Sequence, residues 1–302
     1  MQEHSHPARC PDCDGDSPVF LGSLPDVVRF AGKRLPAPLY GGALFQCGRC
    51  RLKFRHPLLD TKTYEDLYDN GLVASWTPTL RTDQRIVREF LCEKLRGGRV
   101  LDYGCYTGLF LSSLPAAFSK FGVEVNKLAA AKAERDANAR VWRELEEMDD
   151  DQQFDGVVCM DVVEHFPSPL LLVRELMRKL RPGGVLLMTT GDAESALWNR
   201  LGSRWWYCGF GEHVAFISRG WLVHNLATLG ADLEQCEPFN YKSEGRALRV
   251  ARWGAFMGAL VLSGLRSLMS GAVVANDHRK VAKALPGIGL TRDHLFIVLR
   301  KR

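Results

Sequence analysis

The sequence predicts an α/β fold, with a doubly wound parallel sheet preceded by a small N-terminal module. From Arg99 onward, short apolar runs alternate with segments of helical spacing, which is the pattern of β-α units that assemble into a parallel sheet. Residues 1–56 instead carry two Cys-x-x-Cys pairs in a chain punctuated by Gly and Pro, which favours loops and small strands. The 302 residues, 46% of them hydrophobic, are enough for a full core and an extra module.

Each expected element follows from a local pattern. Residues 61–95 are expected to be helical, because their apolar residues recur at helical spacing. Short continuous apolar runs predict buried strands, and longer periodic or Ala-rich runs predict helices. The strands are expected at 99–104, 118–125, 154–163, 185–191 and 293–302, and the helices at 107–114, 126–139, 170–180 and 221–230. A Pro-Gly-Gly stop at 181–184 should end the third of these helices.

Composition narrows the class of protein. Lys and Arg number 40 against 35 Asp and Glu, a net charge of +5, and this mild, dispersed excess does not by itself argue for nucleic acid. Residues 1–20 contain no apolar signal segment, and the cysteines outside the two pairs stand alone. Both features fit a reducing compartment, so we expect a cytoplasmic protein.

An apolar run at 254–265 is interrupted by Arg266 before further apolar residues up to 275. A membrane-spanning helix needs about 20 apolar residues, so the run favours a buried or amphipathic helix. Flanking arginines leave peripheral membrane contact through 254–275 as the alternative.

Cys10, Cys13, Cys47 and Cys50 form the two Cys-x-x-Cys pairs. Each pair places two thiolates on one tight turn, and two such turns complete the tetrahedron that Zn²⁺ prefers. Because protein ligands would fill all four positions, we expect a structural zinc that folds a segment too small for its own core. A redox pair, or two unrelated pairs, is the alternative.

The segment Leu101–Gly108, LDYGCYTG, ends the first strand. Gly104 and Gly108 let the backbone approach a ligand closely, and ligands of such sheets bind beyond the carboxyl ends of the strands. The segment lacks Gly-x-Gly-x-x-Gly, so a dinucleotide is not expected. Glu124 ends the second strand at the interval where an acidic residue reaches ribose hydroxyls; a solvated strand-end carboxylate is the alternative.

Four blocks now carry a family resemblance. VLDYGCYTGLFL, FGVEV, FDGVVCMDVVEHFPSP and LRPGGVLLMTTGD resemble, in order and spacing, the class I S-adenosylmethionine-dependent methyltransferases. The cysteine pairs before them and GEHVAFISRGWLVHNLATLGADL after them are similar to bacterial zinc-containing methyltransferases, including sugar C-methyltransferases.

The resemblance implies a Rossmann-like sheet of seven strands with a zinc module and a helical cap. The implied parts are a zinc-binding module at 1–60, a helical lid or linker at 61–96, an S-adenosylmethionine-binding domain at 97–240, and a helical insertion with the final strand at 241–302.

The resemblance also implies a cofactor-binding set at the ends of the first three strands, namely Asp102, Gly104, Cys105, Gly108, Glu124, Met160 and Asp161. Those in the first segment would line the methionine part, Glu124 would hold the ribose hydroxyls, and the last two would border the sulfonium and adenosine. Tyr106 departs from the family, which usually has glycine or a small residue there. Its ring must point away from the cofactor or narrow the pocket.

Histidines are candidate general bases, because an ordinary pKa of about 6.5 leaves them largely neutral at pH 7. His213 follows Glu212 beyond an aromatic stretch, and a Glu-His pair in this region is the proposed base of the similar sugar C-methyltransferases. His165 lies just beyond the third strand, where it would act in catalysis, hold its loop, or bind a metal with Glu164. Tyr68 matches a tyrosine that touches cofactor or substrate in similar proteins; an ordinary packing aromatic is the alternative.

The sequence therefore predicts S-adenosylmethionine-dependent methyl transfer to a small molecule, with a sugar or nucleotide sugar indicated as the acceptor, at carbon or oxygen. A zinc-containing RNA methyltransferase is one alternative, although no basic stripe or basic–aromatic interleaving supports it. A catalytically degenerate scaffold of the same fold is the other, motivated by Tyr106. Binding of the cofactor separates the scaffold from the two enzymes.

Overall fold

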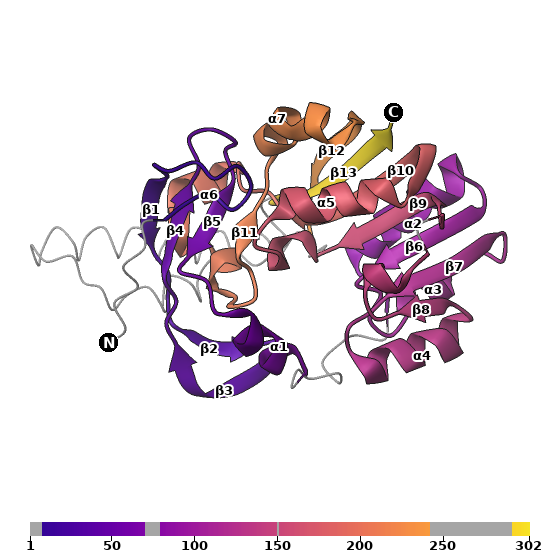
Figure 1. Ribbon diagram of the computed structural model, residues 1–302, viewed down its shortest axis with the longest axis horizontal. Coiled ribbons are helices and arrows are strands. Elements are labelled where there is room, and N and C mark those ends of the chain that lie inside the picture. The colour runs from indigo at the N-terminus through magenta and orange to yellow at the C-terminus, as the bar shows by residue number, and fades with distance from the viewer. Residues whose placement is uncertain (1–7, 70–78, 150, 242–291) are drawn as a thin grey trace, which may run out of the picture.

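The computed structural model describes residues 8–69, 79–149, 151–241 and 292–302 (Figure 1). The apolar run at 254–275 and most of the predicted helical insertion lie outside these residues. Among the helices described, none is long and apolar enough to cross a membrane.

Seven strands form the central sheet, in the order β12-β13-β10-β9-β6-β7-β8. The pairs from β8 to β10 are parallel, and β13 runs antiparallel to both of its neighbours. The strands are β6 (Gly98–Tyr103), β7 (Phe118–Val123), β8 (Arg140–Trp142), β9 (Phe154–Met160), β10 (Leu180–Gly191), β12 (Ala231–Phe239) and β13 (His294–Lys301). The prediction of an α/β fold with a doubly wound, seven-stranded sheet is confirmed.

Helices cover both faces of this sheet. They are α2 (Thr82–Lys94), α3 (Leu109–Ser113), α4 (Lys127–Ala137), α5 (Pro169–Arg178) and α7 (Arg219–Leu229). Successive strand residues face opposite sides: Val158 and Leu187 pack in the core with α2, α3 and α4, whereas Val157 and Leu186 pack with α5 and α7. This alternation explains why the inner strands are apolar throughout and read as continuous runs.

The helix ends follow local capping chemistry. The Asn126 side chain accepts hydrogen bonds from two backbone amides at the start of α4, and Ser168 and Ser218 do the same for one amide each at α5 and α7. Gly230 ends α7 in the left-handed conformation, the usual role of glycine at that position. Each cap satisfies amides that have no partner inside the helix.

The N-terminal module is a second, small antiparallel sheet in the order β1-β4-β5-β11, with a separate hairpin of β2 and β3. Its strands are β1 (Val19–Ser23), β2 (Val27–Phe30), β3 (Lys33–Leu39), β4 (Ala43–Gln46), β5 (Lys53–His56) and β11 (Ala215–Phe216). Strand β11 comes from the chain that follows the parallel strands. The module's sheet is therefore completed by a distant part of the sequence.

The remaining helices are short. They are α1 (Thr61–Asp69), α6 (Ala196–Leu201) and the 3₁₀ helices η2 (Leu145–Glu147), η3 (Val163–His165), η4 (Gly202–Arg204) and η5 (Trp206–Gly209). The carboxyl ends of the parallel strands point toward the N-terminal module (Figure 1). Any site at that edge thus lies between the two sheets.

Candidate functional site

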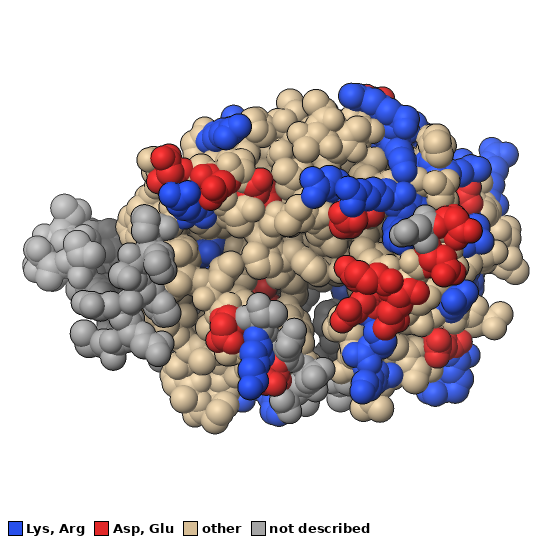
Figure 2. All heavy atoms as spheres, in the orientation of Figure 1, with Lys and Arg blue, Asp and Glu red and all other residues tan. Residues whose placement is uncertain are grey.

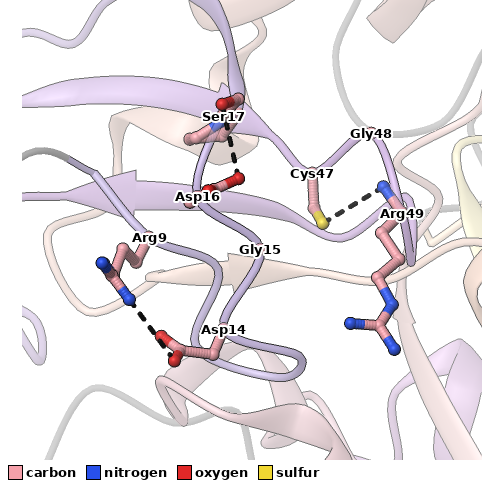
Figure 3. A pocket seen from close by; sticks show the side chains of 9 residues that line it. Arg9, Asp14, Gly15, Asp16, Ser17, Cys47, Gly48 and Arg49 are labelled. Atoms are coloured by element: carbon pink, nitrogen blue, oxygen red, sulfur yellow. Dashed lines mark hydrogen bonds and ion pairs between the residues drawn. The ribbon is translucent and has the colours of Figure 1, made fainter.

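The four paired cysteines converge on one point. Their Sγ atoms all lie within 4.8 Å of one another, with 3.4 Å between Cys10 and Cys50 and 3.5 Å between Cys13 and Cys47. A disulfide bond is about 2.05 Å long, whereas Zn–S bonds of about 2.3 Å in a tetrahedron separate the sulfurs by about 3.8 Å. The Arg49 amide donates to Cys47 Sγ at 3.4 Å (Figure 3), which favours a thiolate. These residues fit a closed, four-sulfur zinc site.

An open hollow of about 470 Å³ lies beside these cysteines, and Arg9, Asp14 and Arg49 line part of it (Figure 3). An ion pair of 3.5 Å joins Arg9 and Asp14. None of the lining residues belongs to the predicted catalytic or cofactor sets. The hollow is a surface feature of the module.

Asp12, inside the first cysteine pair, ties the module to the large sheet. Its Oδ1 accepts hydrogen bonds from Ser168 Oγ at 2.8 Å and from the Leu170 amide at 3.1 Å, and its Oδ2 accepts one from Trp221 Nε1 at 2.7 Å. Burial raises the pKa of this carboxyl above its ordinary value. Since the donors belong to the start of α5 and to α7, the cysteine turn is fixed against the helical layer.

The predicted cofactor loop follows β6 with left-handed backbone at three positions: φ is 81° at Gly104, 47° at Tyr106 and 74° at Gly108. A Cβ at Gly104 would lie 2.6 Å from Val162 Cγ2, so that position admits no side chain. The left-handed conformation costs a non-glycine residue about 1–2 kcal/mol, and Tyr106 bears this cost. The Tyr106 amide donates to Glu124 Oε2 at 2.9 Å, which holds the loop in this shape.

Three carboxylates end neighbouring parallel strands at this loop: Asp102 on β6, Glu124 after β7 and Asp161 after β9. Burial raises the pKa of Asp102 to about 7. Within the described chain, Asp161 Oδ1 is buried and has no hydrogen-bond partner. These carboxylates accept hydrogen bonds and attract positive charge. They therefore suit a ligand that carries cationic groups and a sugar diol, such as S-adenosylmethionine. Met160, which immediately precedes Asp161, is buried in the sheet core.

Arg81 is a residue that the sequence patterns did not single out. It precedes α2 and pairs with Asp83 through Nε–Oδ1 and Nη2–Oδ2 distances of 3.1 and 2.6 Å. Its Nη2 also lies 3.5 Å from Asp161 Oδ2. The signal in the sequence is the Arg-x-Asp spacing of Arg81 and Asp83 at the start of the helix that precedes β6.

A second polar cluster lies at the same edge, where η3 follows β9. Tyr68 Oη lies 2.7 Å from His165 Nδ1, and the ring centroids of His165 and His213 are 5.1 Å apart. The Val214 amide donates to the Glu164 carbonyl at 2.8 Å, which keeps His213 beside η3. The structure therefore brings together Tyr68, His165 and His213, which are far apart in the sequence.

Hydrogen bonds orient the buried groups of this cluster. His213 Nδ1 lies 2.9 Å from the Tyr207 carbonyl, so this nitrogen carries the proton and Nε2 keeps its lone pair. The Glu164 carboxylate accepts hydrogen bonds from the Tyr207 hydroxyl and, at 2.9 Å, from Thr190 Oγ1. Tyr207 thus connects Glu164 and His213 through its side chain and its backbone.

Burial dominates the ionisation of the cluster. It lowers the pKa of His165 to about 4 and that of His213 well below the ordinary value. It raises the pKa of Glu164 to about 7. Both imidazoles are therefore neutral at pH 7, as a general base or a metal ligand must be.

Glu212, the residue before His213, lies against the hairpin of β2 and β3. Its carboxylate accepts from the Ala31 backbone amide, while its Oε2 has no hydrogen-bond partner in the part of the chain described. Burial raises its pKa. Cys105, from the predicted cofactor set, is buried and packs against Gly122 on β7, so its sulfur lies in the core beneath the loop.

A further imidazole, that of the buried His294 at the start of β13, was not predicted. Its Nδ1 lies 3.0 Å from Asp293 Oδ1, and its ring centroid lies 5.3 Å from that of Tyr207. The Trp206 indole donates to Asp293 Oδ2 at 3.2 Å. An Asp-His dipeptide that opens the last strand is the only signal in the sequence, and it gives no indication of this contact.

Glu164, His165 and His213 are also close enough to hold a cation between them, because one ligand atom of each lies within 4.8 Å of the others. Two imidazoles and a carboxylate are ligands that several divalent metals accept. The lone pair of His213 cannot serve a metal and an acceptor proton at the same time.

Comparison with known proteins defines the class. Residues 79–235, just over half of the chain, match the family described as "Methyltransferase domain". The chain belongs to this family, and the predicted class of protein, a methyltransferase, is confirmed.

Among curated proteins, the chain is similar to the ubiquinone biosynthesis O-methyltransferases of Xanthomonas campestris pv. campestris (strain B100) and Alkalilimnicola ehrlichii. The identities are 34% over 110 residues and 31% over 105 residues; each match covers 32% of this chain, and 44% and 42% of the relatives. The chain thus spans less than half of the length of these relatives.

Among solved structures, the chain is similar to the cyclase SpnF, with a TM-score of 0.49 and 18% identity over 81% of this chain and 98% of that one. It is also similar to the N-methyltransferase NodS from Bradyrhizobium japonicum WM9 in complex with S-adenosyl-l-homocysteine. That TM-score is 0.45, with 13% identity over 76% of this chain and 94% of that one.

Proposed function

We propose that this protein transfers a methyl group from S-adenosylmethionine to a small-molecule acceptor. One observation carries the proposal: the cluster of the half-buried Tyr68 and His165 with the buried His213 lies at the sheet edge that also presents the carboxylates of Asp102 and Asp161. A proton acceptor and a cation-binding loop at one edge are the two parts that methyl transfer needs.

S-adenosylmethionine, when bound, supplies a methyl group on a sulfonium that is already strongly electrophilic. The acidic loop would hold it: Asp102 toward its methionine part, Glu124 at the ribose hydroxyls and Asp161 beside the adenosine and sulfonium. Gly104, Cys105 and Gly108 shape the backbone that approaches it. Fixed placement of the reacting groups supplies much of the barrier reduction.

His213 acts as general base in this proposal. Its Nδ1–H is held by the Tyr207 carbonyl, so Nε2 is free to take a proton from the acceptor. A carboxylate oxygen of Glu164 lies within 4.8 Å of a ring nitrogen of each histidine, and it stabilises the imidazolium that forms on His213. A positioned base contributes about 10²–10⁴-fold to the rate. His165 and Tyr68 bind and orient the acceptor, and Glu212 contributes a buried carboxylate near Tyr68.

The acceptor is a hydroxyl-bearing small molecule in this proposal. The curated relatives are named O-methyltransferases, which supports oxygen as the methylated atom. A sugar or nucleotide sugar remains the class that the sequence resemblance indicates, at carbon or oxygen. On the face shown in Figure 2, Lys and Arg lie among Asp and Glu without a continuous basic stripe, which supports a small acceptor over RNA.

Two experiments test this function in sequence. Calorimetric titration with S-adenosylmethionine and S-adenosylhomocysteine should give one-to-one binding in the micromolar range; a folded protein that binds neither would instead support the scaffold. Acceptor screens then compare the wild type with His213→Ala, and with His224→Ala on the exposed side of α7 as the matched control. We expect His213→Ala to lose turnover and keep its cofactor affinity, and unchanged turnover would remove His213 as the base.

A cation held by Glu164, His165 and His213 is the alternative role for this cluster, supported by their mutual distances. Isothermal titration of the zinc-loaded protein with Mg²⁺, Mn²⁺ or additional Zn²⁺ distinguishes the two roles. A second binding event that His165→Ala removes would favour the cation, and its absence would favour the base.

A zinc ion in the N-terminal module completes the proposal. The sulfur–sulfur distances of 3.4 and 3.5 Å support four-thiolate coordination, which leaves no open position for a substrate. Its role is to fix the turns that carry Asp12 and lead into β5.

A further inference from the structure

We infer that the N-terminal module is part of the active site, because Arg55 on β5 acts as a positioning residue that holds the loop carrying His213. This inference rests on the proposed function for its catalytic meaning. It extends the proposed function by assigning a role to a buried cation of the N-terminal module, which lies outside the residues that match the methyltransferase family.

The contacts of Arg55 are concentrated on one loop. Its Nε donates to the His213 carbonyl at 3.3 Å, and its Nη2 donates to the carbonyls of Cys208 at 2.9 Å and Phe210 at 3.0 Å. Its Nη1 donates to the Gly41 carbonyl, which belongs to the module itself. Arg55 is only 4% exposed. One guanidinium therefore bridges the module and both ends of the segment 208–213.

The backbone reinforces the same connection. The Arg55 amide donates to the Val214 carbonyl at 2.8 Å, and β5 pairs with β11 through Ala215 opposite Phe54. Val214, directly after His213, is thus hydrogen-bonded to β5, and the next residue begins β11 of the module's sheet. A shift of β5 would move His213 with it.

Only arginine can satisfy this arrangement. Its planar fork offers five N–H donors in fixed directions and stays charged even when buried. A lysine carries the charge but concentrates its donors on one nitrogen, so it cannot reach carbonyls on opposite sides. Removal of Arg55 would leave several buried carbonyls without a donor, a cost that the loop would relieve by moving.

The position of Arg55 depends on the cysteine cluster. The Cys47 amide donates to the Leu52 carbonyl at 2.8 Å, and the second cysteine pair leads directly into β5. Tetrahedral coordination would fix this turn, the turn fixes β5, and β5 fixes Arg55. Zinc is in this way connected to the base without touching the substrate.

Lys53 provides a matched control on the same strand. It is also buried, at 5% exposed, and it lies on the same side of β5 because side chains alternate. Its Nζ donates to the Ala193 carbonyl and, at 3.2 Å, to Asn199 Oδ1, not to the His213 loop. It anchors the module to α6 and therefore shares the structural role of Arg55 but not the positioning one.

The test compares Arg55→Ala, Arg55→Lys and Lys53→Met in the full, zinc-loaded chain. We expect Arg55→Ala to lower kcat about 10²-fold, the loss that a displacement of about 1 Å can cause, with the cofactor Kd changed less than twofold. Arg55→Lys should lie between Arg55→Ala and the wild type, and Lys53→Met should keep kcat. Equal loss of kcat in Arg55→Ala and Lys53→Met would overturn the inference.

A readout without turnover separates this inference from the proposed function. Long-range ¹H–¹⁵N spectra of the histidine side chains report the tautomer and environment of His213, assigned by comparison with His213→Gln. We expect the His213 signals to change in both Arg55 variants and not in Lys53→Met. If they change in this way while no acceptor is methylated, Arg55 positions the loop and the proposed function fails. Unchanged His213 signals in folded Arg55→Lys would refute the positioning role even in an active enzyme.

Discussion

Replacement of Asp12 by alanine should destabilise the protein through a single buried contact set. The carboxylate accepts three hydrogen bonds, from Ser168, Leu170 and Trp221. After its removal, Ser168 Oγ still caps α5 by accepting from the Leu171 amide at 3.4 Å, and the Leu170 amide lies in the first turn, where water can replace the lost acceptor. The Trp221 indole N–H loses its acceptor inside the core, because Trp221 is 0% exposed.

The magnitude follows from these three donors. A buried donor left without a partner costs about 1–3 kcal/mol, and a hydrogen bond to a charged group contributes about 1.5–3 kcal/mol. The carboxylate is itself buried, which raises its pKa and offsets part of the gain. We therefore expect Asp12→Ala to lower the free energy of unfolding by about 3 kcal/mol, and Asp12→Asn by about half as much, because one oxygen acceptor remains.

Urea unfolding of the zinc-loaded protein measures this change, and Trp221→Phe supplies the control. Phenylalanine removes the donor and keeps an aromatic ring, so a double-mutant cycle of Asp12→Asn with Trp221→Phe isolates the carboxylate–indole contact. We expect a coupling of about 1–2 kcal/mol. A loss below about 1 kcal/mol in Asp12→Ala, or a coupling near zero, would refute the reasoning that Asp12 docks the module.

Three further predictions follow. Purified protein should hold about one zinc per chain, and Cys47→Ser should lose it; metal analysis that finds no zinc in protein prepared without chelator would overturn the four-cysteine site. Burial gives Asp102 a pKa of about 7, and the cationic cofactor favours the ionised carboxylate. Affinity for S-adenosylmethionine should therefore fall as the pH drops below 7, by up to about tenfold per pH unit. Calorimetry at pH 6 to 8 checks this, and an equal pH dependence in Asp102→Asn would contradict it. Tyr106→Gly should unfold with a free energy within about 1 kcal/mol of the wild type, because relief of the left-handed backbone offsets the greater freedom of glycine in the unfolded chain; a loss of more than about 2 kcal/mol would show that the ring, not the backbone, decides the conformation there.

The elements predicted best were those with both a periodic pattern and a capping signal. The helix expected at 221–230 is α7, which ends at Leu229 before a left-handed Gly230. Strands β8 and β12 were not identified individually. Strand β8 has only three residues, and β12 is an edge strand with Pro238 and several acids, which weaken a strand pattern but are tolerated at an edge. Strand β10 begins at Leu180, with a register shift before Val185, so the Pro-Gly-Gly segment lies within the strand instead of ending a helix.

The sequence identified the candidate site in part because its residues end predicted strands. Asp102, Glu124 and Asp161 could be placed at one edge by topology alone. The contact between Tyr68 and His165 requires α1 to pack back against the edge of the large sheet, and no local sequence pattern predicts that packing. Arg55 was missed for a different reason: a charged residue in a short strand is expected at the surface, and only the carbonyls of a distant loop explain its burial.

Because β11 completes the sheet of the N-terminal module, the chain cannot be divided cleanly into an N-terminal module and a methyltransferase domain. The portion that matches the family, 79–235, contains β11 but not β5, its partner. A protein trimmed to begin at residue 79 would present the backbone groups of Ala215 and Phe216 as an unprotected edge and would leave the 208–213 loop without its guanidinium anchor. The cysteine segment and the segment around β11 therefore form one structural unit. We expect a chimera that carries only one of them on a related methyltransferase to lack the β5–β11 pairing.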